Sequence, residues 1–116
     1  MTIEQVMRTL EAALITPGAD LSVQVHAACG SDMMSDVLAY VKDQAVLLTG
    51  LNNPQVVRTA EMMDMVCIVY VRGKTPQPEV AAMAAERGIA VLSTPLPMFT
   101  ACGRLYEQGL RGGNMP

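Results

Sequence analysis

Apolar, strand-like runs alternate with helix-like segments along this chain, and four of the runs end in a short polar cluster. The clusters occupy residues 30–32, 49–53, 72–75 and 93–94. From Ala45 onward the alternation is regular, which predicts parallel strands joined by crossover helices. In such open α/β sheets ligands bind at the carboxyl ends of the strands. The pattern therefore predicts where a site lies, but it names neither a ligand nor a reaction.

Apolar periodicity and turn residues set the expected elements. Helices are expected over residues 2–14, 31–40, 54–63, 78–87 and 98–109, and strands over residues 21–28, 45–49, 65–71 and 89–92. Residues 65–71 form a continuous, largely β-branched run, which is typical of a strand covered on both faces. Asn53 before Pro54 predicts a capped helix start. We expect one three-layer α/β/α sandwich over residues 1–110, with a mainly parallel sheet of four or five strands and a flexible tail at 111–116.

Charge and hydropathy limit the partners. The net charge is −3, and the eight Lys and Arg residues are scattered rather than gathered in a stripe. Nucleic acid is therefore not an expected partner. No apolar run approaches the ~18 residues of a membrane span, and the first residues lack the features of a signal peptide. The sequence predicts a cytoplasmic protein with no membrane partner.

Short polar and charged residues at the expected strand ends are the candidate ligand-binding residues. They are Gly30, Ser31, Asp32, Ser35, Asn52, Asn53, Arg72, Lys74, Ser93 and Thr94. Helix starts that follow strand ends present free N–H groups, which suit an anion or a nucleotide. Arg72 or Lys74 would supply positive charge. The opposite rim of the sheet, near Asp20, Asp43 and Gly88, is not where we expect binding.

The run Gly73-Lys74-Thr75 resembles the end of a nucleotide-binding P-loop but does not satisfy that motif. The motif needs a glycine where this chain has Ile68, and its loop runs directly into a helix. Here Pro76 follows at once. We interpret the run as a surface turn.

A Ser-Asp pair occurs twice, at residues 31–32 and 35–36, one helical turn apart. Two interpretations stay open at this point, because Ser and Asp cap helices and also bind ligands or cations. An enzyme, such as a small phosphotransferase or hydrolase, would use Asp32, Asp36 and Ser31. Against it, the sequence offers no nucleophile–base pair, metal-ligand cluster or phosphate loop. No metal or cofactor is expected.

Other reactive or adaptable residues have ordinary interpretations. The single histidine, His26, lies in an expected strand and is interpreted as structural. Cys29 adjoins a polar cluster, but no neighbouring basic residue is visible to activate it, so burial is favoured over reactivity. Ten methionines, several of them clustered, suit either core filling or a soft partner surface.

Three segments carry a resemblance to a known family. They are residues 30–37, 78–94 and 99–107. Together they resemble the DRTGG domain, which is related to the N-terminal domain of HPr kinase/phosphorylase. The pattern Ser-Asp-x-x-Ser-Asp-Val resembles a stand-alone subgroup encoded beside iron-only hydrogenase and NADH-linked electron-transfer subunits. The chain departs from the family at residues 51–54, which read Leu-Asn-Asn-Pro instead of the name-giving Asp-Arg-Thr.

The resemblance implies an HPr-kinase N-domain-like α/β/α sandwich that pairs into homodimers and accompanies regulatory regions. It implies a non-catalytic module that senses a small anionic or nucleotide effector and acts with a redox complex. A serine-kinase label is not supported, because this sequence lacks the P-loop catalytic part. The alternatives are a protein-interaction scaffold without a ligand and the small enzyme based on Asp32 and Asp36.

Overall fold

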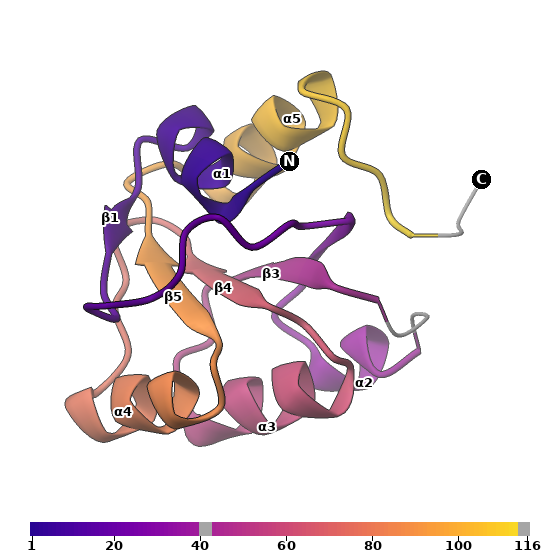
Figure 1. Ribbon diagram of the computed structural model, residues 1–116. Coiled ribbons are helices and arrows are strands. Elements are labelled where there is room, and N and C mark those ends of the chain that lie inside the picture. The colour runs from indigo at the N-terminus through magenta and orange to yellow at the C-terminus, as the bar shows by residue number, and fades with distance from the viewer. Residues whose placement is uncertain (40–42, 114–116) are drawn as a thin grey trace.

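A computed structural model describes residues 1–39 and 43–113 as three layers, with a five-stranded sheet between two layers of helices (Figure 1). The elements, in chain order, are α1 (Ile3–Thr9), β1 (Ala13–Leu14), β2 (Ala27–Gly30), α2 (Met34–Val37), β3 (Ala45–Thr49), α3 (Pro54–Met62), β4 (Cys67–Tyr70), α4 (Pro78–Glu86), β5 (Ala90–Ser93) and α5 (Met98–Glu107). Helices α1 and α5 cover one face of the sheet, and α2, α3 and α4 cover the other. The α/β/α sandwich is confirmed.

The sheet has the order β1-β5-β4-β3-β2. Strands β2 to β5 are parallel, and only β1 runs antiparallel to its neighbour β5. The β-branched run predicted to be covered on both faces is β4, the central strand, and all four of its residues are buried. The sheet thus has five strands and is mainly parallel, as predicted.

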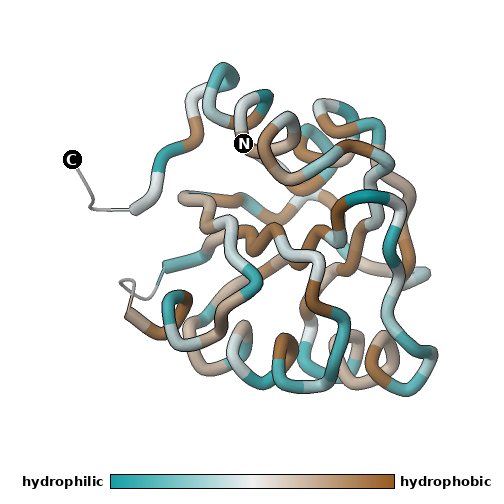
Figure 2. The backbone as a smooth tube through the Cα atoms, turned by 180° about the vertical axis from the view of Figure 1, so that it is seen from behind, coloured by the Kyte–Doolittle hydropathy of each residue, from teal (hydrophilic) through white to brown (hydrophobic). Residues whose placement is uncertain are grey.

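Side chains of the inner strands alternate between two apolar clusters, as a pleated strand requires. Leu47 and Ile68 point toward α2, α3 and α4, whereas Leu48 and Val69 point toward α1 and α5. Figure 2 shows the result: hydrophobic backbone segments gather along the strands, and hydrophilic segments lie on the outer turns of the helices.

The expected first helix over residues 2–14 is too long, and its last part is wrong. Helix α1 ends at Thr9, and Glu11 then takes a left-handed backbone conformation with φ of 52°. That conformation cannot continue a right-handed helix. Ala13 and Leu14 instead pair with Ser93 and Leu92 to form β1.

The next two expectations are also corrected. The strand expected over residues 21–28 forms only as Ala27–Gly30, because the preceding segment bonds to the N-terminus instead: Ile3 N donates to Val23 O and Val25 N to Met1 O. The helix expected over residues 31–40 is the single turn α2. Part of that expected helix, beyond residue 39, lies outside the described residues.

The C-terminal segment lies against the outer edge of β2. Ala28 N donates to Arg111 O at 2.9 Å, and the Arg111 guanidinium stacks 3.8 Å from the centre of the Tyr106 ring. Residues 114–116 of the expected tail lie outside the described residues. Within the described residues, no helix is long and apolar enough to cross a membrane.

Candidate functional site

The carboxyl ends of the four parallel strands meet at one rim of the sheet, and polar side chains from three of the loops that follow them interlock there. Asp32 after β2, Gly50 after β3, and Arg72 and Lys74 after β4 form this group, which we call the carboxyl-rim cluster. Asp32 accepts hydrogen bonds from Gly50 N at 2.6 Å and Thr49 Oγ1 at 3.1 Å. Lys74 Nζ donates to Gly50 O at 3.2 Å.

The carboxylate of Asp32 joins two strand ends rather than capping a helix. The residue before α2 is Met33, and no side chain caps that helix. The hydrogen bond from Gly50 N holds the pKa of Asp32 below its ordinary value, and Thr49, Arg72 and Lys74 add to this effect. A carboxylate with a lowered pKa is a weak base, which argues against the enzyme that uses Asp32 for proton transfer.

Arg72 occupies a strained turn. It has φ of 57° and is followed by Gly73 with φ of 69°, so two successive residues are left-handed. Lys74 N closes the turn onto Val71 O at 3.2 Å, which is the pattern of a type I′ turn. Glycine adopts this conformation freely, whereas arginine pays a conformational cost. Strain of this kind concentrates at functional positions.

The loops after β2, β3 and β4 approach one another closely at Gly50. A Cβ atom built on it would lie 3.0 Å from Arg72 Nη2 and 3.5 Å from Asp32 Oδ1. Gly50 and Thr49 were not among the candidate residues. The cluster at residues 49–53 marked their loop, but only the fold brings that loop against Asp32.

The remaining candidates after β3 and β5 lie at the carboxyl rim, and their side chains form hydrogen bonds within the chain. Ser93 Oγ donates to Lys74 O at 2.8 Å, and Asn52 Nδ2 donates to Thr75 O at 3.3 Å. Asn53 caps α3 by accepting from Gln55 N, as predicted. Thr94 is buried, and its hydroxyl donates to Leu10 O.

Three candidates lie on the β2 side. Ser31 Oγ accepts from Met33 N at 3.0 Å and so stabilises the loop after β2. Ser35 is exposed on α2. Gly30 lies where α5 packs on the strand, because a Cβ there would be 2.7 Å from Cys102 Sγ. Of the ten candidates, the structure thus brings Asp32, Arg72 and Lys74 together as the charged centre.

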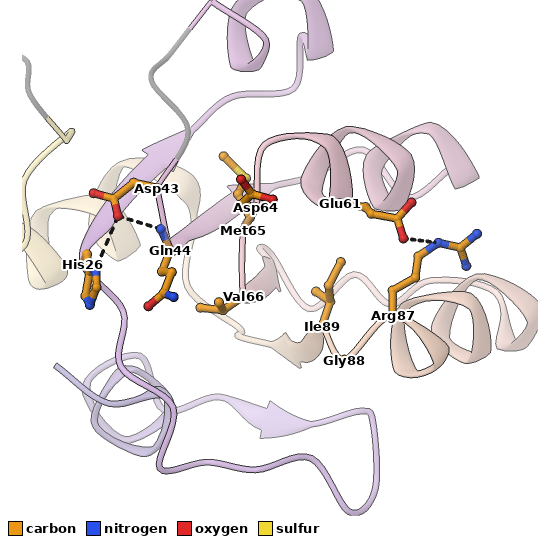
Figure 3. A pocket seen from close by; sticks show the side chains of 10 residues that line it. All are labelled: His26, Asp43, Gln44, Glu61, Asp64, Met65, Val66, Arg87, Gly88 and Ile89. Carbon is orange, nitrogen blue, oxygen red and sulfur yellow. Dashed lines mark hydrogen bonds and ion pairs between the residues drawn. The ribbon is translucent and has the colours of Figure 1, made fainter.

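A second candidate lies at the opposite rim, at the amino ends of the strands (Figure 3). It is a depression of about 590 Å³ lined by His26, Asp43, Gln44, Glu61, Asp64, Met65, Val66, Arg87, Gly88 and Ile89. Its charged side chains largely satisfy one another: His26 Nδ1 lies 3.2 Å from Asp43 Oδ1, and Arg87 Nε lies 3.0 Å from Glu61 Oε2. The sequence predicts Asp43 and Gly88 on this rim and no binding there; the residues of the depression come from loops and helix ends without a common motif.

Among the described residues, neither an activated cysteine thiol nor a group of metal ligands is found. Burial raises the pKa of Cys29 to about 11, and Cys102 nearby adds to the shift, so the thiol is not activated. Burial also raises the pKa values of Cys67 and Cys102. In the described part of the chain, no three His, Cys, Asp or Glu residues are grouped to hold a metal ion.

Fold and site together describe a small α/β domain with charged side chains at the carboxyl rim of its sheet. The DRTGG domain family model matches residues 5–107, so the chain belongs to the DRTGG domain family. The expectation of the family is confirmed.

A solved structure has the same fold. It contains the CBS and DRTGG domains of the regulatory region of Clostridium perfringens pyrophosphatase, in complex with the activator diadenosine tetraphosphate. The TM-score is 0.69 at 15% sequence identity, over 99% of this chain and 52% of that one. This chain therefore spans about half the length of that regulatory region. No curated protein matches the sequence.

Proposed function

We propose that this DRTGG domain is a non-catalytic sensor that binds a small anion or a nucleotide phosphate at the carboxyl-rim cluster. The observation that carries this proposal is that the positive charges of Arg72 and Lys74 are not neutralised by a nearby carboxylate in the part of the chain that the structure describes. Among the described residues, neither Arg72 nor Lys74 lies within 4.0 Å of a carboxylate oxygen in an ion pair. Both are exposed, and within the described part of the chain the Lys74 ammonium group donates its hydrogen bond to the neutral Gly50 carbonyl.

Asp32 supports this arrangement. Its Oδ1 oxygen accepts from Gly50 N and Thr49 Oγ1, so the carboxylate holds the loops together without neutralising either cation in a close pair. Arginine and lysine beside strand ends suit phosphate oxygens, which take charge-assisted hydrogen bonds. The Clostridium perfringens regulatory region, bound to diadenosine tetraphosphate, provides a precedent for nucleotide binding in a protein that contains this domain.

Three finer parts of the proposal rest on the family resemblance. We propose that the domain works as a homodimer in the cytoplasm and that it acts with a redox complex. The Ser-Asp-x-x-Ser-Asp-Val pattern at residues 31–37 supports the redox partner. In this proposal Arg72 and Lys74 bind the ligand, and the other candidate ligand-binding residues hold the loops of the carboxyl rim in place.

The test is calorimetric titration of the protein with inorganic phosphate, AMP, ATP, NADH and diadenosine tetraphosphate. We expect at least one compound to bind and to raise the melting temperature, because a ligand that binds only the native state stabilises it. Arg72→Gln and Lys74→Gln should each weaken binding about tenfold, which corresponds to about 1.4 kcal/mol.

Arg87→Gln is the matched control, since it removes one positive charge at the opposite rim. Binding should be unchanged in this variant. Loss of binding in Arg87→Gln but not in Arg72→Gln would move the site to the amino-rim depression. Absence of binding for the whole panel would favour the scaffold alternative.

A further inference from the structure

Helix α5 carries two exposed aromatic side chains on one face, and the Arg111 guanidinium stacks on the ring of one of them, Tyr106. Phe99 is 91% exposed and Tyr106 is 60% exposed. They lie seven residues apart, two helical turns, so their side chains share one face about 10 Å apart. Gly103 lies between them on that face, and a Cβ built on it meets no atom within 4 Å. We call Phe99, Gly103 and Tyr106 the α5 stripe.

This exposure is unusual for the composition of the chain. The protein has one Phe, three Tyr and no Trp, and its single Phe has the highest exposure among the large apolar side chains that the structure describes. The opposite face of α5 packs on the sheet, where Ala101 and Leu105 are buried. Exposed aromatic residues are the residue type enriched at the centres of protein interfaces.

A two-fold axis through the middle of the stripe would pair the stripe with itself. The midpoint between Phe99 and Tyr106 falls between residues 102 and 103. A two-fold axis at that point sets two α5 helices antiparallel, with Phe99 of each copy level with Tyr106 of the other. Gly103 then lies at the crossing point, where the absence of a side chain lets two helix backbones approach. Two-fold pairing of one patch with itself is the commonest route to a dimer.

The area is compatible with a reversible dimer. Aromatic side chains bury about 150–250 Å² each, so four partly exposed rings contribute roughly 600 Å² to a pair. A specific interface buries about 1,200–2,000 Å² in total. The rest would come from the polar residues that flank the stripe, which include Thr100 and Glu107 and which would form the rim. The small apolar centre favours reversible association.

We infer that the α5 stripe is the homodimer interface, with the α5 helices of two copies packed antiparallel about an axis near Gly103. The inference rests on the homodimer in the proposed function and adds the surface through which it forms. This face is built by α5, with Arg111 stacked on Tyr106, and does not use the charged side chains of the carboxyl-rim cluster.

Sedimentation velocity over about 1–500 μM tests the inference. The wild-type mass should rise from 12.4 kDa toward twice that value. Phe99→Glu and Tyr106→Glu should each shift the dissociation constant at least about thirtyfold, because each buries a charge in the apolar centre. Met62→Glu is the control, since Met62 is a 57% exposed apolar residue on α3. Circular dichroism checks that every variant is folded.

A cross-linking experiment tests the axis separately. Gly103→Cys should form a disulfide-linked dimer under mild oxidation, because the two sulfurs lie beside the two-fold axis. Wild-type protein is the control, since Cys102 packs toward Gly30 of its own chain. A monomer at every concentration, or a dimer that tolerates Phe99→Glu, would overturn the inference. Nucleotide titration of the Phe99→Glu protein tests ligand binding at the carboxyl-rim cluster separately from dimer formation.

Discussion

Asp32 links the loops of two strands through its carboxylate, and its pKa in the folded protein is lowered, first by the Gly50 N–H. Its contribution to stability is therefore present above the unfolded pKa of about 3.9 and is lost as pH falls through the folded value. The side chain is exposed, so solvent screening keeps the effect small. Asp32→Asn should lower the free energy of unfolding by about 1 kcal/mol at pH 7. Urea unfolding at pH 7 and pH 2.5 checks this, and a difference that persists at the lower pH would contradict it.

Arg72 shows a conflict between backbone conformation and charge. Its left-handed backbone costs a non-glycine residue on the order of 1 kcal/mol. Arg72→Gly should therefore raise the free energy of unfolding by up to about 1 kcal/mol while it weakens phosphate binding about tenfold. Thermal melting and calorimetric titration measure the two effects. Arg72→Ala separates them, since it removes the charge without relieving the strain. A less stable Arg72→Gly protein would show that the side chain is mainly structural.

At the scale of elements, the start of α3 offers a test of the cap assignment. Asn53 accepts a hydrogen bond from Gln55 N at 3.0 Å, directly before Pro54. Asn53→Ala should lower the free energy of unfolding by about 1 kcal/mol, and Asn53→Asp should restore it. Urea unfolding provides the measurement. Ligand affinity should stay constant in both variants, so a loss of affinity at unchanged stability would make Asn53 a ligand contact.

The elements that the sequence predicted well are those bounded by proline or glycine. Helix α3 begins at Pro54, and α4 begins at Pro78 and is followed by Gly88 with φ of 70°. The N-terminal elements were predicted less well because contacts with distant parts of the chain, and not the local sequence, decide their conformation. Ala13 and Leu14 continue a helical spacing, but pairing with β5 decides their conformation.

The same distinction applies to the site. The rim on which the candidates lie follows from strand direction alone, and the alternation of elements predicted it. Individual roles depend on contacts between distant segments. Asp32 bonds to Gly50, eighteen residues away, and Thr94 bonds to Leu10, eighty-four residues away. No local pattern distinguishes these positions from ordinary helix caps and turns.

For the whole molecule, Thr94 joins parts of the chain that are far apart in sequence. Its buried hydroxyl donates to Leu10 O at 2.5 Å and accepts from Leu96 N at 3.2 Å, so it links the end of α1 to the segment before α5. Thr94→Val should lower the free energy of unfolding by about 2 kcal/mol, because both partners lose their hydrogen bond. Thr94→Ser should retain most of the stability. Differential scanning calorimetry measures the change, and equal melting of all three proteins would contradict the prediction.

The four parallel strands are bordered on each side by a segment from near one end of the chain. Strand β1 lies along β5, and the backbone of Arg111 bonds to Ala28 on β2. Unpaired strand edges are templates for foreign strands. Removing the chain from Arg111 onward would leave the Ala28 N–H free and expose a ready template for fibril-like stacking. A fluorescent or affinity tag that displaces this segment would expose the same edge.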